Sequence, residues 1–102
     1  MIKVNFELNN GLFTAVTIEG HSNFDKKGSD IVCAGVSAVG VGSLNALIEI
    51  TKTKPHYRME DGYLYVEFDQ SKEAQMIALI LSIQLKSIEE NYKKYIKITY
   101  GR

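Results

Sequence analysis

Polar and apolar residues alternate along the first twenty positions of the chain. The apolar positions Ile2, Val4, Phe6 and Leu8 are separated by polar ones, and this period of two is typical of a half-buried β-strand. A second run, Leu12–Glu19, follows Asn9-Asn10-Gly11. The Asn-Gly pair favours a tight hairpin turn because both residue types tolerate positive φ. The pattern predicts a β-hairpin that ends near Gly20.

From residue 31 to about residue 50 the apolar spacing becomes helical, after a polar segment at residues 22–29 that we expect to be an exposed, mobile loop. Asp30 is the predicted N-cap, because a carboxylate accepts N–H bonds from the first turn of a helix. Cys33 would then lie in that first turn. Glycines at positions 35, 40 and 42 each cost a helix about 1 kcal/mol relative to Ala. We therefore expect close packing there, in a helix buried on most sides.

The second half of the chain repeats the order of strands and helix. Residues 56–60 and 63–68 flank Asp61-Gly62, a second hairpin signal. Ser71 can cap an amphipathic helix that runs to about Tyr92, and residues 95–100 predict a last strand. The order ββαββαβ predicts an α+β fold, a two-layer sandwich with the helices packed on one sheet. The order of the strands in that sheet does not follow from these patterns.

Length and composition limit the classes of function. The 102 residues predict a single domain, residues 1–102. Twelve basic and twelve acidic residues cancel, so we expect neither nucleic acid nor an anionic membrane as a partner. Glycines and polar residues interrupt the longest apolar stretch, and we therefore expect no membrane span. One cysteine excludes an intramolecular disulfide, and the alternating N-terminus is unlike a signal peptide. These features predict a cytoplasmic protein.

The candidate chemistry lies between Gly20 and Cys33. Cys33 is the only cysteine, and His21 stands twelve residues before it. A helix start and a nearby imidazolium both favour a thiolate, so Cys33 is the candidate nucleophile and His21 the candidate general base and acid. Asp30 either orients His21 or is only the helix cap, and the sequence leaves both open.

Each of these residues also has a purely structural interpretation. A lone cysteine is most often a buried small hydrophobe, and Ser37, one turn further on, could simply bond to the preceding turn. We expect His56, which follows a proline at a strand start, to be structural. A Cys–His pair supplies too few ligands for zinc. We therefore predict no metal and no cofactor.

Gly20-His21 is followed by six loop residues and then by Gly-Ser-Asp-Ile-Val-Cys-Ala-Gly-Val-Ser, which ends at Ser37. This string resembles the signature of the ribosomal-processing cysteine protease family. The resemblance extends over the whole chain. It implies an endopeptidase that removes a short N-terminal extension from large-subunit ribosomal protein number twenty-seven, after an aromatic pair. It also implies a homodimer.

Carried over by position, the resemblance gives His21 and Cys33 as the catalytic dyad and Asp30 as the motif aspartate. Ser37 matches a serine of the same motif. We expect five residues around the dyad to contact the substrate, namely Gly20, Ser22, Asn23, Phe24 and Ser37.

Two other classes of function stay open. The chain could be a non-catalytic, ribosome-associated binding module whose cysteine is incidental. Small basic clusters, Lys52, Lys54 and Arg58 or Lys93, Lys94 and Lys97, could serve it, although a net charge of zero argues against strong RNA binding. The same cysteine would also suit an acyltransferase or a redox sensor. The product of the reaction discriminates between these and a protease.

Overall fold

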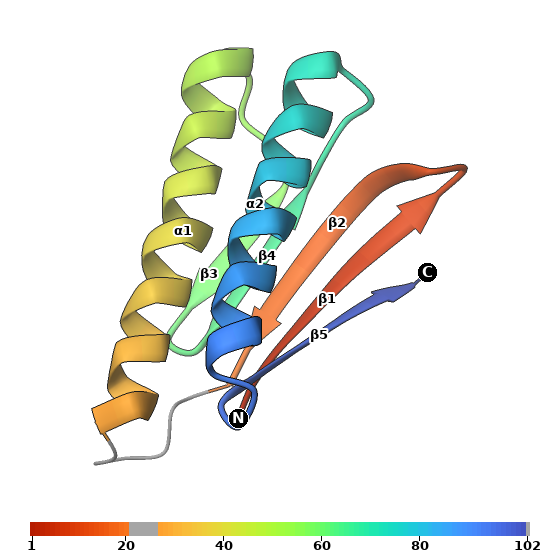
Figure 1. Cartoon of the computed structure of the whole chain (residues 1–102). Helices are drawn as coiled ribbons and strands as arrows, with labels where there is room; N and C mark the ends of the chain where they lie inside the picture. Colours follow the sequence, from red (N-terminus) through yellow and green to blue (C-terminus); the bar gives the residue numbers. More distant parts are fainter. Residues whose placement is uncertain (21–26, 102) are drawn as a thin grey trace.

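The computed structural model describes residues 1–20 and 27–101, and for residues 27–30 it describes only the path of the chain. Within these residues the elements follow the predicted order ββαββαβ (Figure 1). Their bounds are β1 (Ile2–Asn9), β2 (Leu12–Glu19), α1 (Lys27–Thr51), β3 (Tyr57–Glu60), β4 (Tyr63–Glu67), α2 (Lys72–Asn91) and β5 (Ile96–Gly101).

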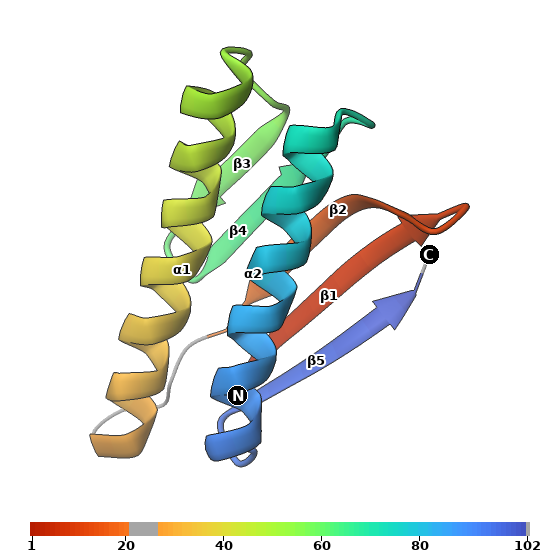
Figure 2. The same ribbon diagram turned by 45° about the horizontal axis from the view of Figure 1, so that its top comes forward.

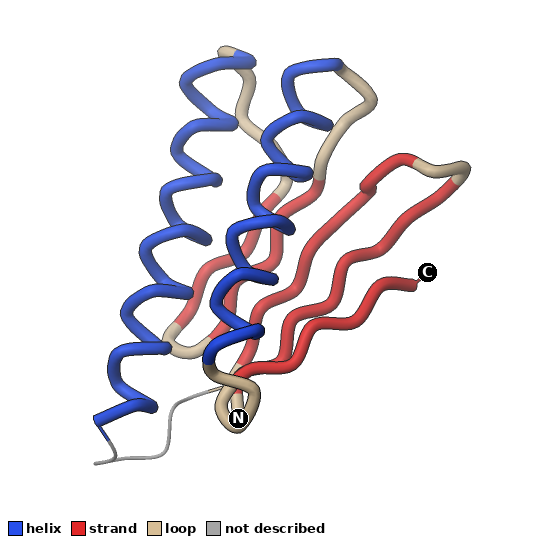
Figure 3. Tube along the Cα trace, in the orientation of Figure 1, coloured by secondary structure: helices blue, strands red, loops and turns tan. Residues whose placement is uncertain are grey.

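The strands form one five-stranded sheet in the order β3-β4-β2-β1-β5. Neighbouring strands are antiparallel except β1 and β5, which run parallel. The helices α1 and α2 lie side by side in opposite directions on one face of this sheet (Figures 2 and 3). The predicted two-layer α+β sandwich is confirmed, and the structure adds the strand order.

Both hairpin turns have the backbone that their residues favour. Asn10 and Gly11 take φ values of 54° and 78°, positive at both central positions, as a type I′ turn requires. At the β3–β4 turn Gly62 takes φ of 73°. Both predicted hairpins are confirmed.

The helix α1 begins at Lys27, earlier than the sequence predicted. Asp30 is therefore inside the first turn and is not the N-cap, so the predicted cap is wrong. Residues 27–29, predicted as loop, are helical, while residues 22–26 lie outside the described residues. Acidic residues are favourable throughout the first turn of a helix as well as at the N-cap. An aspartate therefore does not by itself indicate the residue at which α1 begins.

Only one face of α1 is buried. Its inward positions recur every three or four residues, at Val32, Val36, Gly40, Leu44 and Leu47. On the outside, Ile31 and Ile50 are 59% and 56% exposed. The expectation that this helix is buried on most sides is wrong, because the sheet and the neighbouring helix α2 (Lys72–Asn91) leave its outer face open.

By length and composition alone, Ile31–Thr51 could also cross a membrane, a test that core helices pass as well. The glycines and polar residues within it therefore do not exclude a span on their own. In the structure, the inner face of this segment packs on the sheet.

The glycines of α1 differ in their surroundings. A Cβ atom on Gly40 would lie 3.2 Å from Ile18 Cδ1 and 3.2 Å from Leu64 Cδ2, so the helix backbone approaches the sheet closely there. A Cβ on Gly35 would make an ordinary contact, and one on Gly42 would meet nothing within 4 Å. The predicted close packing is confirmed at Gly40 and wrong at Gly42.

The helix α2 is fixed at its first turn by two side chains. Ser71 is the N-cap, and its Oγ accepts the backbone N–H of Ala74 at 3.1 Å, as predicted. The side chain of Gln75 bridges to β2: the N–H of Phe13 donates to Gln75 Oε1 at 2.8 Å, and Gln75 Nε2 donates to the Phe13 carbonyl at 2.7 Å. These bonds hold the start of α2 against the sheet.

The core between the layers is apolar and continuous. It contains every second residue of the central strands and the inward stripes of both helices, including Ile2, Val4, Phe6, Val16, Ile18, Leu64, Val66, Val32, Val36, Leu44, Leu47, Ala78, Leu81, Leu85 and Ile96.

Candidate active site

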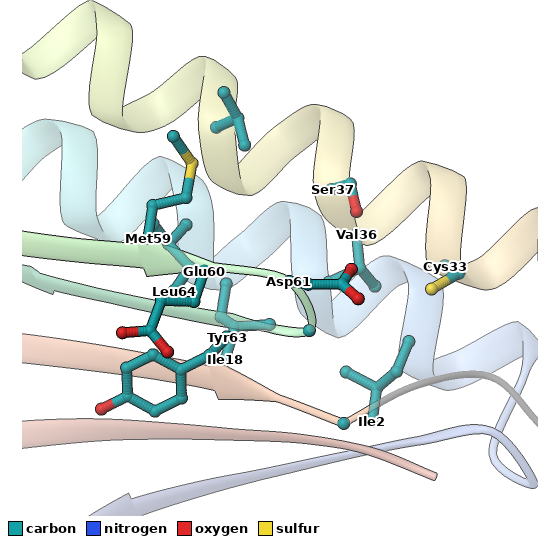
Figure 4. Close-up of a pocket in the computed structure, with 13 residues that line it drawn as sticks. Ile2, Ile18, Cys33, Val36, Ser37, Met59, Glu60, Asp61, Tyr63 and Leu64 are labelled. Atoms are coloured by element: carbon teal, nitrogen blue, oxygen red, sulfur yellow. The ribbon is translucent and has the colours of Figure 1, made fainter.

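The side chain of Cys33 is partly buried and lies at the edge of the core. It also lines a cavity of about 270 Å³ between α1 and the β3–β4 hairpin (Figure 4). A thiol that was only a small core hydrophobe would be enclosed on all sides. The position of Cys33 therefore allows it to meet a molecule that enters the cavity.

Three parts of the fold build the walls of this cavity. The sheet supplies a mainly apolar floor, α1 supplies Cys33 and its neighbours on one helix face, and the β3–β4 hairpin closes the third side. The lining residues are Ile2, Ile18, Gly20, Cys33, Val36, Ser37, Val41, Met59, Glu60, Asp61, Gly62, Tyr63 and Leu64.

Gly20, at the end of β2, connects two of these walls. Its N–H donates to the carbonyl of Gly62 in the β3–β4 turn at 3.0 Å. Its φ is 111°, and a Cβ atom there would lie 2.5 Å from the Met1 carbonyl oxygen. Only glycine fits such a backbone, so this residue type fixes the end of the strand against the hairpin turn.

Among the described residues, the charged side chains that line the cavity, Glu60 and Asp61, belong to the hairpin. Arg58 Nε donates to Glu60 Oε2 at 2.6 Å, and this bond raises the pKa of the Arg58 guanidinium. The guanidinium also lies over the ring of Tyr63, 5.5 Å from its centre. Asp61 follows in the turn, and its carboxylate extends toward the side of α1 that carries Ser37 and Cys33 (Figure 4).

The structure brings together three of the residues predicted from the sequence: Gly20, Cys33 and Ser37 all line the cavity. Ser37 is exposed there, one turn after Cys33. Cys33 is the seventh residue of α1, and the effect of a helix dipole falls off within the first turn. The prediction that Cys33 lies in the first turn of the helix is therefore wrong.

Other predicted site residues cannot be placed. His21, Ser22, Asn23 and Phe24 lie outside the described residues, as does the side chain of Asp30. Their predicted roles as base, substrate contacts, orienter or cap stay predictions, except that the backbone excludes Asp30 as the N-cap.

The sequence did not point to the third wall of the cavity. This wall includes Met59, Glu60, Asp61 and Tyr63, which line the cavity of Cys33 from a hairpin more than twenty residues further along the chain. The Asp-Gly turn itself was predictable, but its place beside the site depends on β4 pairing with β2, which local patterns do not encode.

His56 lies away from Cys33. It lines a different cavity, of about 340 Å³, with residues such as Lys54 and Asp69, and its ring stands 6.2 Å from that of Tyr65. It is not placed to act on the thiol. Within residues 1–20 and 27–101, no group of three or more His, Cys, Asp or Glu side chains could hold a metal ion.

Comparison with known proteins agrees with this site. Residues 1–97 match the family model described as cysteine protease Prp. The ribosomal processing cysteine protease Prp of Staphylococcus aureus strain Mu50 is 37% identical over 105 residues, which cover 98% of this chain and 99% of that protein.

Two crystal structures of the S. aureus protein share the fold, and each match covers 98% of this chain and 99% of that one. One holds a covalently linked product peptide, with a TM-score of 0.88 and 38% identity. The other holds a substrate peptide, with a TM-score of 0.90 and 36% identity. The match over nearly the whole chain, together with a cavity lined by its single thiol, leads to one conclusion: this chain belongs to the cysteine protease Prp family and is a cysteine protease.

Proposed function

We propose that this protease removes the N-terminal extension of large-subunit ribosomal protein number twenty-seven and cleaves after an aromatic residue. The observation that carries the proposal is the cavity that Cys33 shares with Gly20 and Ser37. The S. aureus relatives are ribosomal processing proteases and bind peptides, which supports a peptide from a ribosomal protein as the substrate here.

In this proposal Cys33 and His21 perform the chemistry. The Cys33 thiolate attacks the carbonyl carbon of the scissile bond, and His21 gives its proton to the leaving amine. The resulting thioester is then hydrolysed by a water molecule whose proton returns to His21. Gly20 supports this assignment, because it lines the cavity of Cys33 and directly precedes His21 in the sequence.

A peptide with the sequence of the N-terminal extension tests the activity and the dyad together. The wild type should cleave one bond, observed by mass spectrometry, while Cys33→Ala and His21→Ala should lose cleavage by several orders of magnitude. His56→Ala is the matched control, because His56 is the other histidine and lines a different cavity. It should cleave at the wild-type rate.

The outcomes separate the alternatives. Cleavage that survives His21→Ala would require another base, and cleavage that survives Cys33→Ala would require another nucleophile. If the folded wild type binds the peptide but does not cleave it, the proposed substrate is wrong.

The proposal includes a second copy of the chain and a cytoplasmic location. Six exposed apolar side chains on α1 and α2 support a homodimer through the face opposite the sheet: Ile31, Ile50, Met76, Leu79, Ile80 and Ile83. Analytical ultracentrifugation of the wild type should give twice the chain mass. Ile83→Lys should give the mass of a single chain. Lys86→Glu, a control on the same helix, should keep the mass of two chains.

Fractionation of cells that express the tagged chain tests the cytoplasmic location.

A further inference from the structure

We propose that Asp61, at the rim of the cavity beside Cys33, selects a lysine or arginine next to the substrate side chain that enters this cavity. This inference rests on the proposed protease function of the same site and assigns its specificity. It makes Asp61 a specificity-determining residue that acts on the substrate and not on the thiol.

The size and lining of the cavity indicate what enters it. Sites for complete drug-sized ligands measure about 300–1,000 Å³, while this cavity measures about 270 Å³. Its walls include the apolar side chains of Ile18, Val36 and Leu64. These dimensions fit a side chain of an extended peptide whose backbone runs past Cys33.

The charges of the hairpin indicate what lies next to that side chain. The carboxylate of Glu60 is already bonded to Arg58 at 2.6 Å, so its charge is compensated. Asp61 has no ion pair with any residue in the described part of the chain. Its negative charge is therefore available to a cation that arrives with the substrate.

The rim that carries Asp61 is held in place before the substrate binds. The β3–β4 turn contains only Asp61 and Gly62 between the paired residues Glu60 and Tyr63. The Gly62 carbonyl also accepts the N–H of Gly20, the residue that directly follows β2. Because the backbone of this short turn is fixed, the Asp61 carboxylate can lie only within a limited region of the rim, so it can discriminate between positions along a bound peptide.

The expected effect is moderate because Asp61 is exposed. Exposed ion pairs contribute up to about 1 kcal/mol, which corresponds to about a two- to fivefold change in affinity. Loss of the buried apolar side chain has a larger effect on affinity, about tenfold or more, because the burial of a whole apolar side chain is lost.

The experiment uses a set of peptides in which a single lysine moves through the positions on either side of the scissile bond, with alanine or glutamate as replacements. Wild type and Asp61→Asn are compared by kcat and KM at low salt and at 0.5 M NaCl. Glu73→Gln removes the same charge from the exposed surface of α2 and is the matched control. Binding of the same peptides to Cys33→Ala, by fluorescence anisotropy, gives affinities without cleavage.

We expect one lysine position at which Asp61→Asn raises KM about two- to fivefold, with little change in kcat, and no effect on the alanine peptide. At 0.5 M NaCl, wild type and Asp61→Asn should have the same KM for this peptide. Glu73→Gln should have the wild-type KM at both salt concentrations. Replacement of the neighbouring apolar residue by serine should weaken binding to Cys33→Ala about tenfold or more.

The inference is overturned if Asp61→Asn changes all peptides equally, or changes none, while the wild type cleaves them. It is also overturned if Glu73→Gln reproduces the effect. If the wild type cleaves no peptide, the proposed function fails. The anisotropy series on Cys33→Ala then still decides whether Asp61 recognises a cation.

Discussion

Gly40 and Gly42 lie half a turn apart on α1, one facing the sheet and one facing outward. An added methyl group should therefore affect the stability of the protein differently at the two positions. In a helix, Ala is about 0.8–1 kcal/mol more favourable than Gly. At exposed Gly42 the new Cβ meets nothing within 4 Å. The free energy of unfolding of Gly42→Ala should therefore rise by most of this difference of about 0.8–1 kcal/mol. For a domain of about 100 residues, that raises Tm by about 4–8 °C.

At Gly40 the same gain is opposed by packing. The new Cβ would lie 3.2 Å from Ile18 Cδ1 and from Leu64 Cδ2, on the two facing strands. Added methyl groups in a filled core cost about 1–3 kcal/mol. The free energy of unfolding of Gly40→Ala should therefore be unchanged or about 2 kcal/mol lower than that of the wild type.

Gly40→Ala should also alter the site. Ile18 and Leu64 both line the cavity of Cys33, so side chains that move away from the new methyl group change its shape. We expect kcat/KM for the peptide to fall in Gly40→Ala and to stay at the wild-type value in Gly42→Ala.

Urea unfolding followed by circular dichroism measures the stabilities, with all variants at one protein concentration because any self-association shifts the midpoint. Equal stabilisation by the two substitutions would refute the close approach of α1 to the sheet. Unchanged kcat/KM in a destabilised Gly40→Ala would refute the link between this contact and the cavity.

Three further predictions concern the frame around the site. Ser71→Ala should lower the free energy of unfolding by about 1 kcal/mol through the loss of the α2 N-cap, and an unchanged urea midpoint would contradict this role. Gln75→Ala should cost about 1–3 kcal/mol because both backbone groups of Phe13 lose their partner; a smaller loss than for Ser71→Ala would show that water replaces the side chain. The hydrogen bond to Glu67 raises the pKa of Tyr65 to about 12. The folded state therefore holds this proton more tightly than the unfolded state, whose tyrosine pKa is about 10. Stability should fall as pH rises from about 10 to 12, and Tyr65→Phe should flatten that slope in urea midpoints measured across the range.

The features that the sequence predicted correctly are local ones. Alternation and an Asn-Gly or Asp-Gly pair define each hairpin within about twenty residues, and Ser71 marks the start of α2. The start of α1 was predicted too late because Asp30 suits the first turn as well as the cap.

The third wall of the site depends on long-range pairing. Asp61 reaches the cavity of Cys33 only because β4 pairs with β2, for example Glu19 with Tyr63. Nothing in the spacing of residues along the chain encodes that choice of neighbour. A candidate nucleophile, Cys33, could therefore be named from the sequence, while the residues around it could be identified only from the fold.

The parallel pairing of β1 with β5 has a consequence for how the protein is made. Ile2 lies opposite Ile96, and the Ile2 N–H donates to the Tyr95 carbonyl at 2.8 Å. Closing a loop of about ninety residues costs about 4 kcal/mol of chain entropy, so this pairing should form late in folding. Until β5 has left the ribosome, one edge of β1 stays open to other strands. Ile2 is also part of the cavity wall. During translation, the wall of the active-site cavity that includes Ile2 should therefore stay incomplete. The protease should become able to cleave its substrate only after β5 has been synthesised.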